Sequence, residues 1–352
     1  MNLPATGFVI DDHSVGPGVR PWVVAELSAN HLGDLERAFA IMEAAAAAGA
    51  SAIKLQTYTA DTITIEHDGP GFRVEGGLWD GRTLHDLYQE AHTPWAWHEA
   101  LFEKGRELGI TVFSAPFDPT AVDLLESLGC PAYKIASFEA VDLPLIERVA
   151  RTGKPVIIST GIVDRGEISE AVAAARNAGC EDLALLHCVS AYPAPPAQSH
   201  VRTIPALADA FGVPVGLSDH TPGTAVAVAA VALGATIIEK HLALARSDGG
   251  PDGAFSLEPN EFTELVRDCH TAAEALGEPH GPRESTATSR IFRRSLYVVA
   301  DTAAGDRFTE NNVRSIRPGW GLAPKYLGKI LGRRAAHDLP RGTPLEWEMI
   351  AE

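Results

Sequence analysis

The chain has 352 residues, 45% of them hydrophobic, and a formal net charge of −17. This hydrophobic content excludes a disordered chain, and the length leaves room for a small extra domain beside a large one. The negative charge argues against a nucleic-acid partner, because a phosphate backbone binds basic surfaces.

Eight short apolar runs follow one another along the chain, and each carries polar or charged residues at its end. Helix-like segments separate the runs, and this alternation predicts parallel strands. Eight such units predict an α/β fold, a closed (β/α)8 TIM barrel over residues 1–276, with its chemistry at the carboxyl ends of the strands. The runs are WVVAE (22–26), AIKLQ (52–56), ITVFS (110–114), AYKIAS (132–137), PVIIST (155–160), LALLHC (183–188), VPVGLSDH (213–220) and ATIIEKH (235–241).

A long insertion, residues 58–91, follows the second run. Long loops at the carboxyl end of a strand are usually functional. Trp79 and Tyr88 supply stacking surface there. We therefore favour a lid or specificity element over a decorative surface insertion.

The composition of the sequence changes after the predicted barrel. Residues 277–290, GEPHGPRESTATSR, are rich in Gly, Pro, Ser and Thr and predict a linker. Residues 291–352 combine short β-like runs with glycine turns. They predict a small β-rich domain with one short helix around residues 324–331.

Four cysteines occur without a C-x-x-C pair, so no disulfide framework is predicted. Cys188 ends an apolar run and is expected to be a buried small hydrophobe. The N-terminus lacks a signal-peptide pattern, and no apolar run has the length of a membrane span. We expect a cytoplasmic protein with no membrane association.

His220 and His241 end the seventh and eighth runs. Neighbouring strand ends would bring the two imidazoles close enough to bind one divalent metal ion. The spacing alone also fits two polar residues that cap the barrel without a metal.

Lys54 and Lys134 lie within predicted strands, where a buried amine without a partner is costly. Glu26, Glu139 or Glu239 could pair with them structurally, or a ligand phosphate or carboxylate could take that place. Glu26 itself fits either a general base or a partner of Lys54. Neutral donors around a bound anion would come from Ser137, Ser159, Thr160 and Ser218.

The predicted barrel carries the motifs AELSANHLGD, AIKLQTYT, FSAPFD, YKIASFE, IISTGI, HCVSAYPAP, GLSDHT and IIEKHLAL. These motifs, in this order, resemble those of the sialic acid synthase family, and the resemblance covers almost the whole chain. The C-terminal RRSLYVVAD and VRSIRPGWGL resemble the family's antifreeze-like (SAF) domain. Within the family, GGLWDGRTLHDLYQEAHTPWAWH, KLQTYT, IASFE and FSLEP are most similar to the pseudaminic acid branch, and the ordinary sialic acid and legionaminic acid synthases are near alternatives.

The resemblance implies a transferase that forms a carbon–carbon bond. Phosphoenolpyruvate condenses with the open-chain aldehyde of an N-acetylated amino sugar, water is consumed, and a nine-carbon 2-keto acid and phosphate leave. For the pseudaminic branch the sugar is 2,4-diacetamido-2,4,6-trideoxy-L-altrose. The alternatives use N-acetylmannosamine or 2,4-diacetamido-2,4,6-trideoxymannose to make N-acetylneuraminate or legionaminate.

The resemblance also implies residue roles. His220 and His241 match the ligands of a divalent metal, Mn²⁺ or Mg²⁺, which acts as a Lewis acid. Glu26 and Glu139 match carboxylates around the reacting sugar and water. Phosphoenolpyruvate binders are matched by Lys54, Lys134, Ser137, Ser159 and Ser218, and sugar-lining positions by Gln56, Tyr192 and Asp252.

Arg317, in SIRPG, matches an SAF-domain arginine that reaches the active site of the other subunit. The resemblance therefore implies a domain-swapped homodimer, with the linker crossing between chains.

Three positions depart from the family pattern. Ala115 stands where the family often has Thr, so one phosphate contact is expected to be missing. Ser190 replaces an Asn of the sialic acid synthases and favours the pseudaminic branch. His187 is Lys in many members of that branch.

Two other functions compete with this interpretation. A barrel that condenses phosphoenolpyruvate with a phosphorylated sugar would need a second basic cluster, and only the scattered Arg165 and Arg246 offer one. A noncatalytic sugar-binding protein would not need the intact lysines and histidines.

Overall fold

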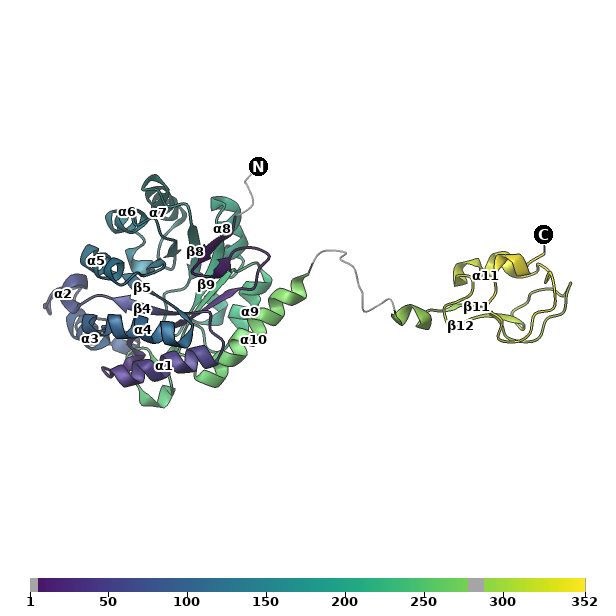
Figure 1. Ribbon diagram of the computed structural model, residues 1–352, viewed down its shortest axis with the longest axis horizontal. Helices are drawn as coiled ribbons and strands as arrows, with labels where there is room; N and C mark the ends of the chain where they lie inside the picture. The colour runs from purple at the N-terminus through teal and green to yellow at the C-terminus, as the bar shows by residue number, and fades with distance from the viewer. Residues whose placement is uncertain (1–5, 278–287, 352) are drawn as a thin grey trace. The chain divides into compact units, whose positions relative to one another are not determined.

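The computed structural model describes residues 6–277 and 288–351 (Figure 1). The chain forms two compact units, residues 1–277 and 278–352. Of the linker expected at 277–290, residues 278–287 lie outside the described residues. Thr288–Phe292 form a 3-10 helix, so the last three positions of that expected linker have regular structure.

A closed barrel of eight parallel strands forms the first unit and confirms the predicted fold class. Each strand pairs with the next along the chain, and the last strand closes the ring against the first. The strands are β3 (Trp22–Glu26), β4 (Ala52–Thr57), β5 (Thr111–Pro116), β6 (Tyr133–Ile135), β7 (Val156–Ser159), β8 (Leu183–Cys188), β9 (Val215–Asp219) and β10 (Ile237–His241).

Helices surround the barrel and cover its outer face (Figure 1). Their apolar sides pack on the strands, and aspartate caps mark where several of them begin. Asp118 and Asp164, for example, accept hydrogen bonds from backbone N–H groups in the first turns of α5 and α7. The outer helices are α1 (Leu35–Ala47), α4 (His98–Leu108), α5 (Pro119–Ser127), α6 (Leu143–Ala150), α7 (Arg165–Asn177), α8 (Thr203–Phe211), α9 (Ala225–Ala232) and α10 (Pro259–Leu276).

A short hairpin of β1 (Phe8–Ile10) and β2 (His13–Val15) packs its apolar residues into the barrel core. Its turn reaches the amino end of β5, where Thr111 Oγ1 donates a 2.8 Å hydrogen bond to Asp11 Oδ2. Because this hairpin contacts the amino end, the opposite, carboxyl end of the strands is left for chemistry.

The insertion after β4 contains α2 (Ala60–Ile63), a 3-10 turn at Gly77–Trp79, and α3 (Leu84–Ala91). Tyr88 of α3 packs edge-on against the buried Tyr58, with ring centroids 5.7 Å apart. Tyr58, at the start of the insertion, packs in turn on Phe117 just after β5, with ring centroids 5.0 Å apart. The insertion is therefore packed onto the barrel at this point.

The second unit is small and β-rich, as predicted. Antiparallel β11 (Ser295–Val298) and β12 (Val313–Ile316) pair at its centre. The expected short helix is present as a 3-10 turn, Pro324–Tyr326, followed by α11 (Leu327–Ile330). This unit has its own buried core, formed mainly by Leu296, Val298, Phe308, Val313, Ile330, Leu339 and Leu345. Among the described helices of either unit, none has the length and apolarity needed to cross a membrane.

Candidate active site

The two-residue period of the strands decides which side chains reach the barrel interior. On β10, Glu239 lies beside Ser218 of β9, and His241 lies beside Glu26 of β3. Lys240, between Glu239 and His241, points to the opposite face of the strand. Polar side chains from several strands therefore converge at one end of the barrel.

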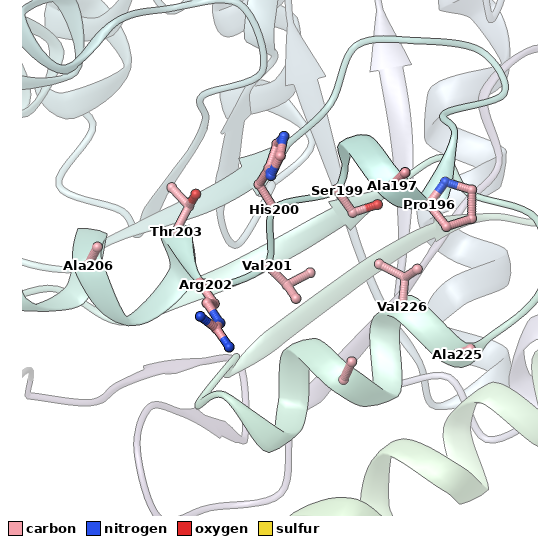
Figure 2. A pocket seen from close by; sticks show the side chains of 11 residues that line it. Pro196, Ala197, Ser199, His200, Val201, Arg202, Thr203, Ala206, Ala225 and Val226 are labelled. Atoms are coloured by element: carbon pink, nitrogen blue, oxygen red, sulfur yellow. The ribbon is translucent and has the colours of Figure 1, made fainter.

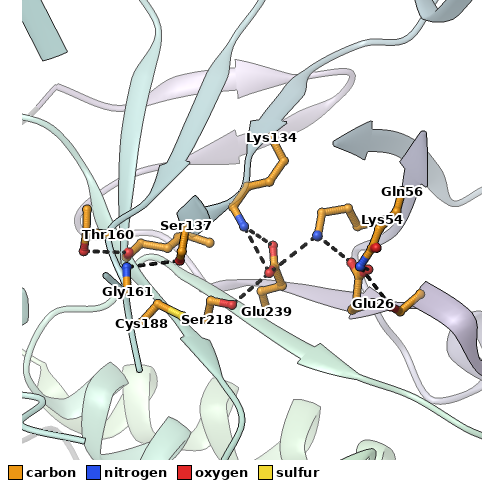
Figure 3. Close-up of polar contacts among 12 residues, drawn as sticks. Glu26, Lys54, Gln56, Lys134, Ser137, Thr160, Gly161, Cys188, Ser218 and Glu239 are labelled. Atoms are coloured by element: carbon orange, nitrogen blue, oxygen red, sulfur yellow. Dashed lines mark hydrogen bonds and ion pairs between the residues drawn. The ribbon is translucent and has the colours of Figure 1, made fainter. Parts of the chain in front are cut away.

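Four buried charges form what we call the charge row: Glu26, Lys54, Glu239 and Lys134 (Figure 3). Lys54 Nζ lies 2.7 Å from Glu26 Oε2 and 3.7 Å from Glu239 Oε1. Lys134 Nζ donates to both Glu239 oxygens at 3.1 Å. The Glu239 carboxylate thus stands between the two amines, and the signs of charge alternate along the row.

Burial and the attraction between opposite charges shift the pKa values of the charge row in opposite directions. Burial alone would raise the pKa of Glu239, but the charges of Lys134 and Lys54 lower it to about 2. Burial lowers the pKa of Lys134, and its attraction to Glu239 only partly offsets this. Burial also raises the pKa of Glu26, and the Glu239 charge adds to that effect. Glu239 is therefore the firmly ionised carboxylate of the row.

The predicted hydroxyl donors lie next to the charge row. Ser218 donates to Glu239 Oε1 at 2.9 Å. The Ser159 hydroxyl is buried and has no hydrogen-bond partner among the described residues. Ser137 lies in a 3-10 turn just after β6, and its Oγ accepts from the Gly161 backbone N–H at 3.0 Å.

Gly161 lies close to two serine hydroxyls, which a larger residue there would displace. A Cβ atom there would lie 2.3 Å from Ser190 Oγ and 2.8 Å from Ser137 Oγ. The Thr160 hydroxyl donates to the Leu186 carbonyl instead of facing the charge row as a free donor.

Glu139 shares the turn that carries Ser137. Its Oε2 is buried without a hydrogen-bond partner among the described residues. Burial raises the pKa of Glu139 from 4.5 to about 7, and the charge of Asp142 adds to this. A carboxyl group with such a pKa can exchange a proton near neutral pH.

His220 and His241 come together as predicted, with ring centroids 5.4 Å apart. The Nδ1 atom of His220 lies 3.1 Å from the Val189 carbonyl, a contact that leaves Nε2 as the free ring nitrogen when Nδ1 donates. The Nδ1 atom of His241 is buried without a hydrogen-bond partner within the described ranges. Burial, followed by the charge of His220, lowers the pKa of His241 well below 6.5 and keeps this imidazole neutral.

These two histidines have the donor chemistry of a metal site with open positions. No group of three or more metal-ligating side chains occurs among the described residues. Any further ligands would have to be water or substrate.

The three predicted sugar-lining residues lie on two sides of the histidines. Gln56 Nε2 donates to Glu26 Oε1 and to Ser28 Oγ, each at 2.9 Å. Ser28 in turn donates to Asp252 Oδ2 at 2.5 Å. Tyr192 packs on His220, with ring centroids 4.4 Å apart.

The predicted residue Arg317 belongs to the second unit and is exposed there, just after β12. Its action at an active site stays a prediction.

Two residues of the site have a weak sequence signal or none, Glu239 and Ser28. The sequence indicates Glu239 only as an ion-pair partner of a lysine, yet its carboxylate lies between both amines of the charge row. The available signal was its position two residues before His241, since residues two apart share a face of a strand. Ser28 gave no comparable signal, because its role depends on Asp252, 224 residues away.

A separate pocket lies between the segment before α8 and helix α9 (Figure 2). Pro196, Val201, Ala225 and Val226 line it, together with the polar Arg202. It shares no residue with the charge row or the histidine pair.

The chain is similar to known proteins over most of its length. Residues 41–281 match the NeuB family, and residues 293–351 match the SAF domain. A Helicobacter pylori protein named pseudaminic acid synthase is 45% identical over 94% of this chain and 98% of its own length. A Campylobacter jejuni protein of the same name is 42% identical over 92% and 95%, respectively.

The chain is also similar to a solved structure. The crystal structure of the N-acetylneuraminic acid synthetase of Leptospira borgpetersenii, in complex with citrate, superposes with a TM-score of 0.73 at 30% identity. The match covers 81% of this chain and 95% of that one. This chain belongs to the NeuB family.

Proposed function

We propose that this protein is a pseudaminic acid synthase. It condenses phosphoenolpyruvate with 2,4-diacetamido-2,4,6-trideoxy-L-altrose and water, and it releases pseudaminate and phosphate. The names of the relatives that are 45% and 42% identical support this substrate choice. The observation that carries the proposal is the meeting of the charge row and the histidine pair at one end of the barrel.

Phosphoenolpyruvate is a small, strongly negative molecule, and the charge row offers it two amines. Lys54 and Lys134 are both nearly inaccessible to water, so their attraction for an anion is weakly screened. The unpartnered Ser159 hydroxyl adds a neutral donor. We assign this group, with Ser137 and Ser218, to phosphoenolpyruvate.

Two carboxyl groups, Glu139 in the turn after β6 and Glu26 of the charge row, would transfer protons. Glu139, with a pKa of about 7 and one unpartnered oxygen, suits the base that takes a proton from the attacking water. Glu26, held by Lys54 and Gln56, faces the aldehyde side of the site. C3 of phosphoenolpyruvate forms the new bond to the aldehyde carbon, whose oxygen takes a proton and becomes a hydroxyl group. C2 then takes the water oxygen, and the bond from C2 to the phosphate oxygen breaks, which releases phosphate and leaves the 2-keto group.

We propose His220 and His241 as the ligands of a divalent ion, Mn²⁺ or Mg²⁺. The unpartnered nitrogen of His241 and the contact of His220 Nδ1 with Val189 fit this role. When bound, such an ion would polarise the aldehyde oxygen as a Lewis acid. Asp252, Gln56 and Tyr192 would then orient the sugar.

We also propose a domain-swapped homodimer in the cytoplasm, with Arg317 completing the partner's site. Four free cysteines are in keeping with a reducing compartment. Arg317→Ala should lower kcat/KM by about 10- to 100-fold, the worth of one or two charge-assisted hydrogen bonds, without changing the melting of the barrel. Mixing Arg317→Ala with His241→Ala, whose own barrel site should be nearly inactive, should restore activity in mixed dimers. An absence of restoration would contradict the exchange of arginines.

The decisive assay offers phosphoenolpyruvate with each of three sugars and identifies the acid product by mass and NMR. The proposal predicts pseudaminate from 2,4-diacetamido-2,4,6-trideoxy-L-altrose at the highest kcat/KM. Higher turnover of N-acetylmannosamine or of 2,4-diacetamido-2,4,6-trideoxymannose would instead identify a neuraminate or legionaminate synthase.

A further inference from the structure

Three aromatic side chains, Trp79, Tyr192 and Phe255, form what we call the aromatic wall. Ring centroids lie 5.5 Å apart for Trp79 and Tyr192, and 5.2 Å apart for Tyr192 and Phe255. Phe255 packs on His241 at 4.9 Å and is buried. Tyr192 and Trp79 are only partly buried, so ring surface of both remains accessible.

The wall joins three segments that are distant in sequence. Trp79 comes from the insertion after β4, Tyr192 from the loop after β8, and Phe255 from the loop after β10. Trp79 therefore brings the insertion to the same end of the barrel as the histidine pair. It stands one ring farther from His220 than Tyr192 does.

The Trp79 indole is held in a fixed position. Its Nε1 donates a 2.9 Å hydrogen bond to the Pro251 carbonyl, next to Asp252. The turn that carries it is closed by a 2.9 Å bond from Gly81 N to Val74 O and a 2.6 Å bond from Gly76 N to Asp80 Oδ1. Because the indole N–H is already engaged, Trp79 offers a ligand ring surface rather than a donor.

Ring surface suits an apolar substituent. The substrate proposed above carries hydrogen rather than hydroxyl at carbon 6, so its far end is a methyl group. With the aldehyde carbon at the histidines, that methyl lies at the end of the sugar that points away from them. A hydroxyl at this place would lose water without gaining a partner from the indole.

We infer that Trp79 is a specificity-determining residue that packs against the carbon-6 methyl group of the amino sugar. The inference rests on the proposed function and extends it to the insertion. A competing role is purely mechanical: the bond to Pro251 would hold the loop of Asp252 in place, and the indole surface would touch nothing.

The test compares kcat/KM for the 6-deoxy sugar and for its 6-hydroxy analogue. Wild type should prefer the 6-deoxy sugar by about 10- to 100-fold, the range that one apolar group gives in a pocket. Trp79→Ala should reduce this ratio about tenfold, by losing activity on the 6-deoxy sugar. Trp79→Phe keeps a ring but loses the bond to Pro251, and it should keep the ratio within about threefold. Leu78→Ala, on the exposed neighbour in the same turn, is the matched control and should behave as wild type.

Three results would overturn the inference. An unchanged ratio in Trp79→Ala would mean that the indole does not contact carbon 6. An equal fall of this kcat/KM ratio in Trp79→Phe and Trp79→Ala would mean that Trp79 acts through its hydrogen bond to Pro251. Failure of wild type to convert either sugar with phosphoenolpyruvate would overturn the proposed function itself, which separates the two cases.

Discussion

Two neighbouring residues of β10 place buried charges in opposite directions, and their surroundings differ. Outward-facing Lys240 lies 2.6 Å from Asp219 Oδ2 and 2.5 Å from the Thr221 carbonyl, a compact pairing of one amine with one carboxylate. Inward-facing Glu239 is shared between Lys54 and Lys134 and also accepts from Ser218. Nearby, Ser159, Glu139 and His241 have buried polar atoms without a hydrogen-bond partner in the part of the chain that the structure describes.

This difference separates a structural ion pair from a binding site. A buried pair whose groups are all satisfied holds the fold, and its removal leaves an uncompensated charge. A buried row with shared partners and free polar atoms is arranged for a further occupant. The same lysine–carboxylate chemistry thus serves the fold on one face of the strand and the reaction on the other.

The largest effect is expected from His241→Ala on the inward face. Loss of one of two proposed metal ligands should lower kcat by about 10⁴-fold, since Lewis-acid catalysis supplies several kcal/mol. Turnover should be measured with added Mn²⁺ and with a chelator. Full activity of the wild type in the chelator would contradict a role of a divalent metal ion in the reaction.

On the outward face, Lys240→Met should affect stability. Asp219 would be left buried and unpaired, which costs about 3–5 kcal/mol of unfolding free energy. Urea unfolding measures this loss. Lys104→Met is the control, because Lys104 pairs with Glu43 at the surface, where water screens the pair, and its loss of unfolding free energy should be far smaller. Equal losses of unfolding free energy in Lys240→Met and Lys104→Met would contradict the structural role of the buried pair.

Lys134→Ala should act mainly on phosphoenolpyruvate. The KM for this substrate should rise by about 10- to 100-fold, the worth of one charge-assisted hydrogen bond. Glu239 keeps Lys54 and Ser218 as partners, so the folded protein should survive the change. An unchanged KM, with a loss of stability instead, would make Lys134 a structural residue like Lys240.

The smallest effect concerns pH. Because burial raises the pKa of Glu139 to about 7, activity that needs its ionised form should fall about tenfold per pH unit below 7. The folded state then holds this proton more tightly than the unfolded state, so the group's stabilising contribution is complete below about pH 4.5 and is lost as the pH rises to 7. Glu139→Gln should lose activity and the acid limb of the pH profile, yet be at least as stable as wild type at pH 8. An unaltered acid limb would assign that limb to another group.

The fold was predictable because strand and helix periods alternate so regularly. All eight apolar runs became barrel strands, and only their ends differ. The run AYKIAS, for example, ends as a strand at Ile135, and Ser137 belongs to the following turn. Local pattern does not fix such boundaries, since they depend on how the loop packs against Gly161.

The site was predictable where strand ends carry it and unpredictable where loops meet. The lysines and histidines follow from their strand positions. The hydrogen bond from Trp79 to Pro251 joins residues 172 positions apart, and no periodicity of the sequence predicts it. The different roles of Glu239 in the site and of Lys240 in the fold likewise became clear only from the register of β9 against β10.

The most direct test of the central claim is a crystal structure of the enzyme with phosphoenolpyruvate. The account predicts that its phosphate and carboxylate oxygens lie within hydrogen-bond distance of Lys54 Nζ and Lys134 Nζ, while the pair of Lys240 and Asp219 stays unchanged. Phosphoenolpyruvate bound elsewhere, with the charge row closed as it is here, would contradict it.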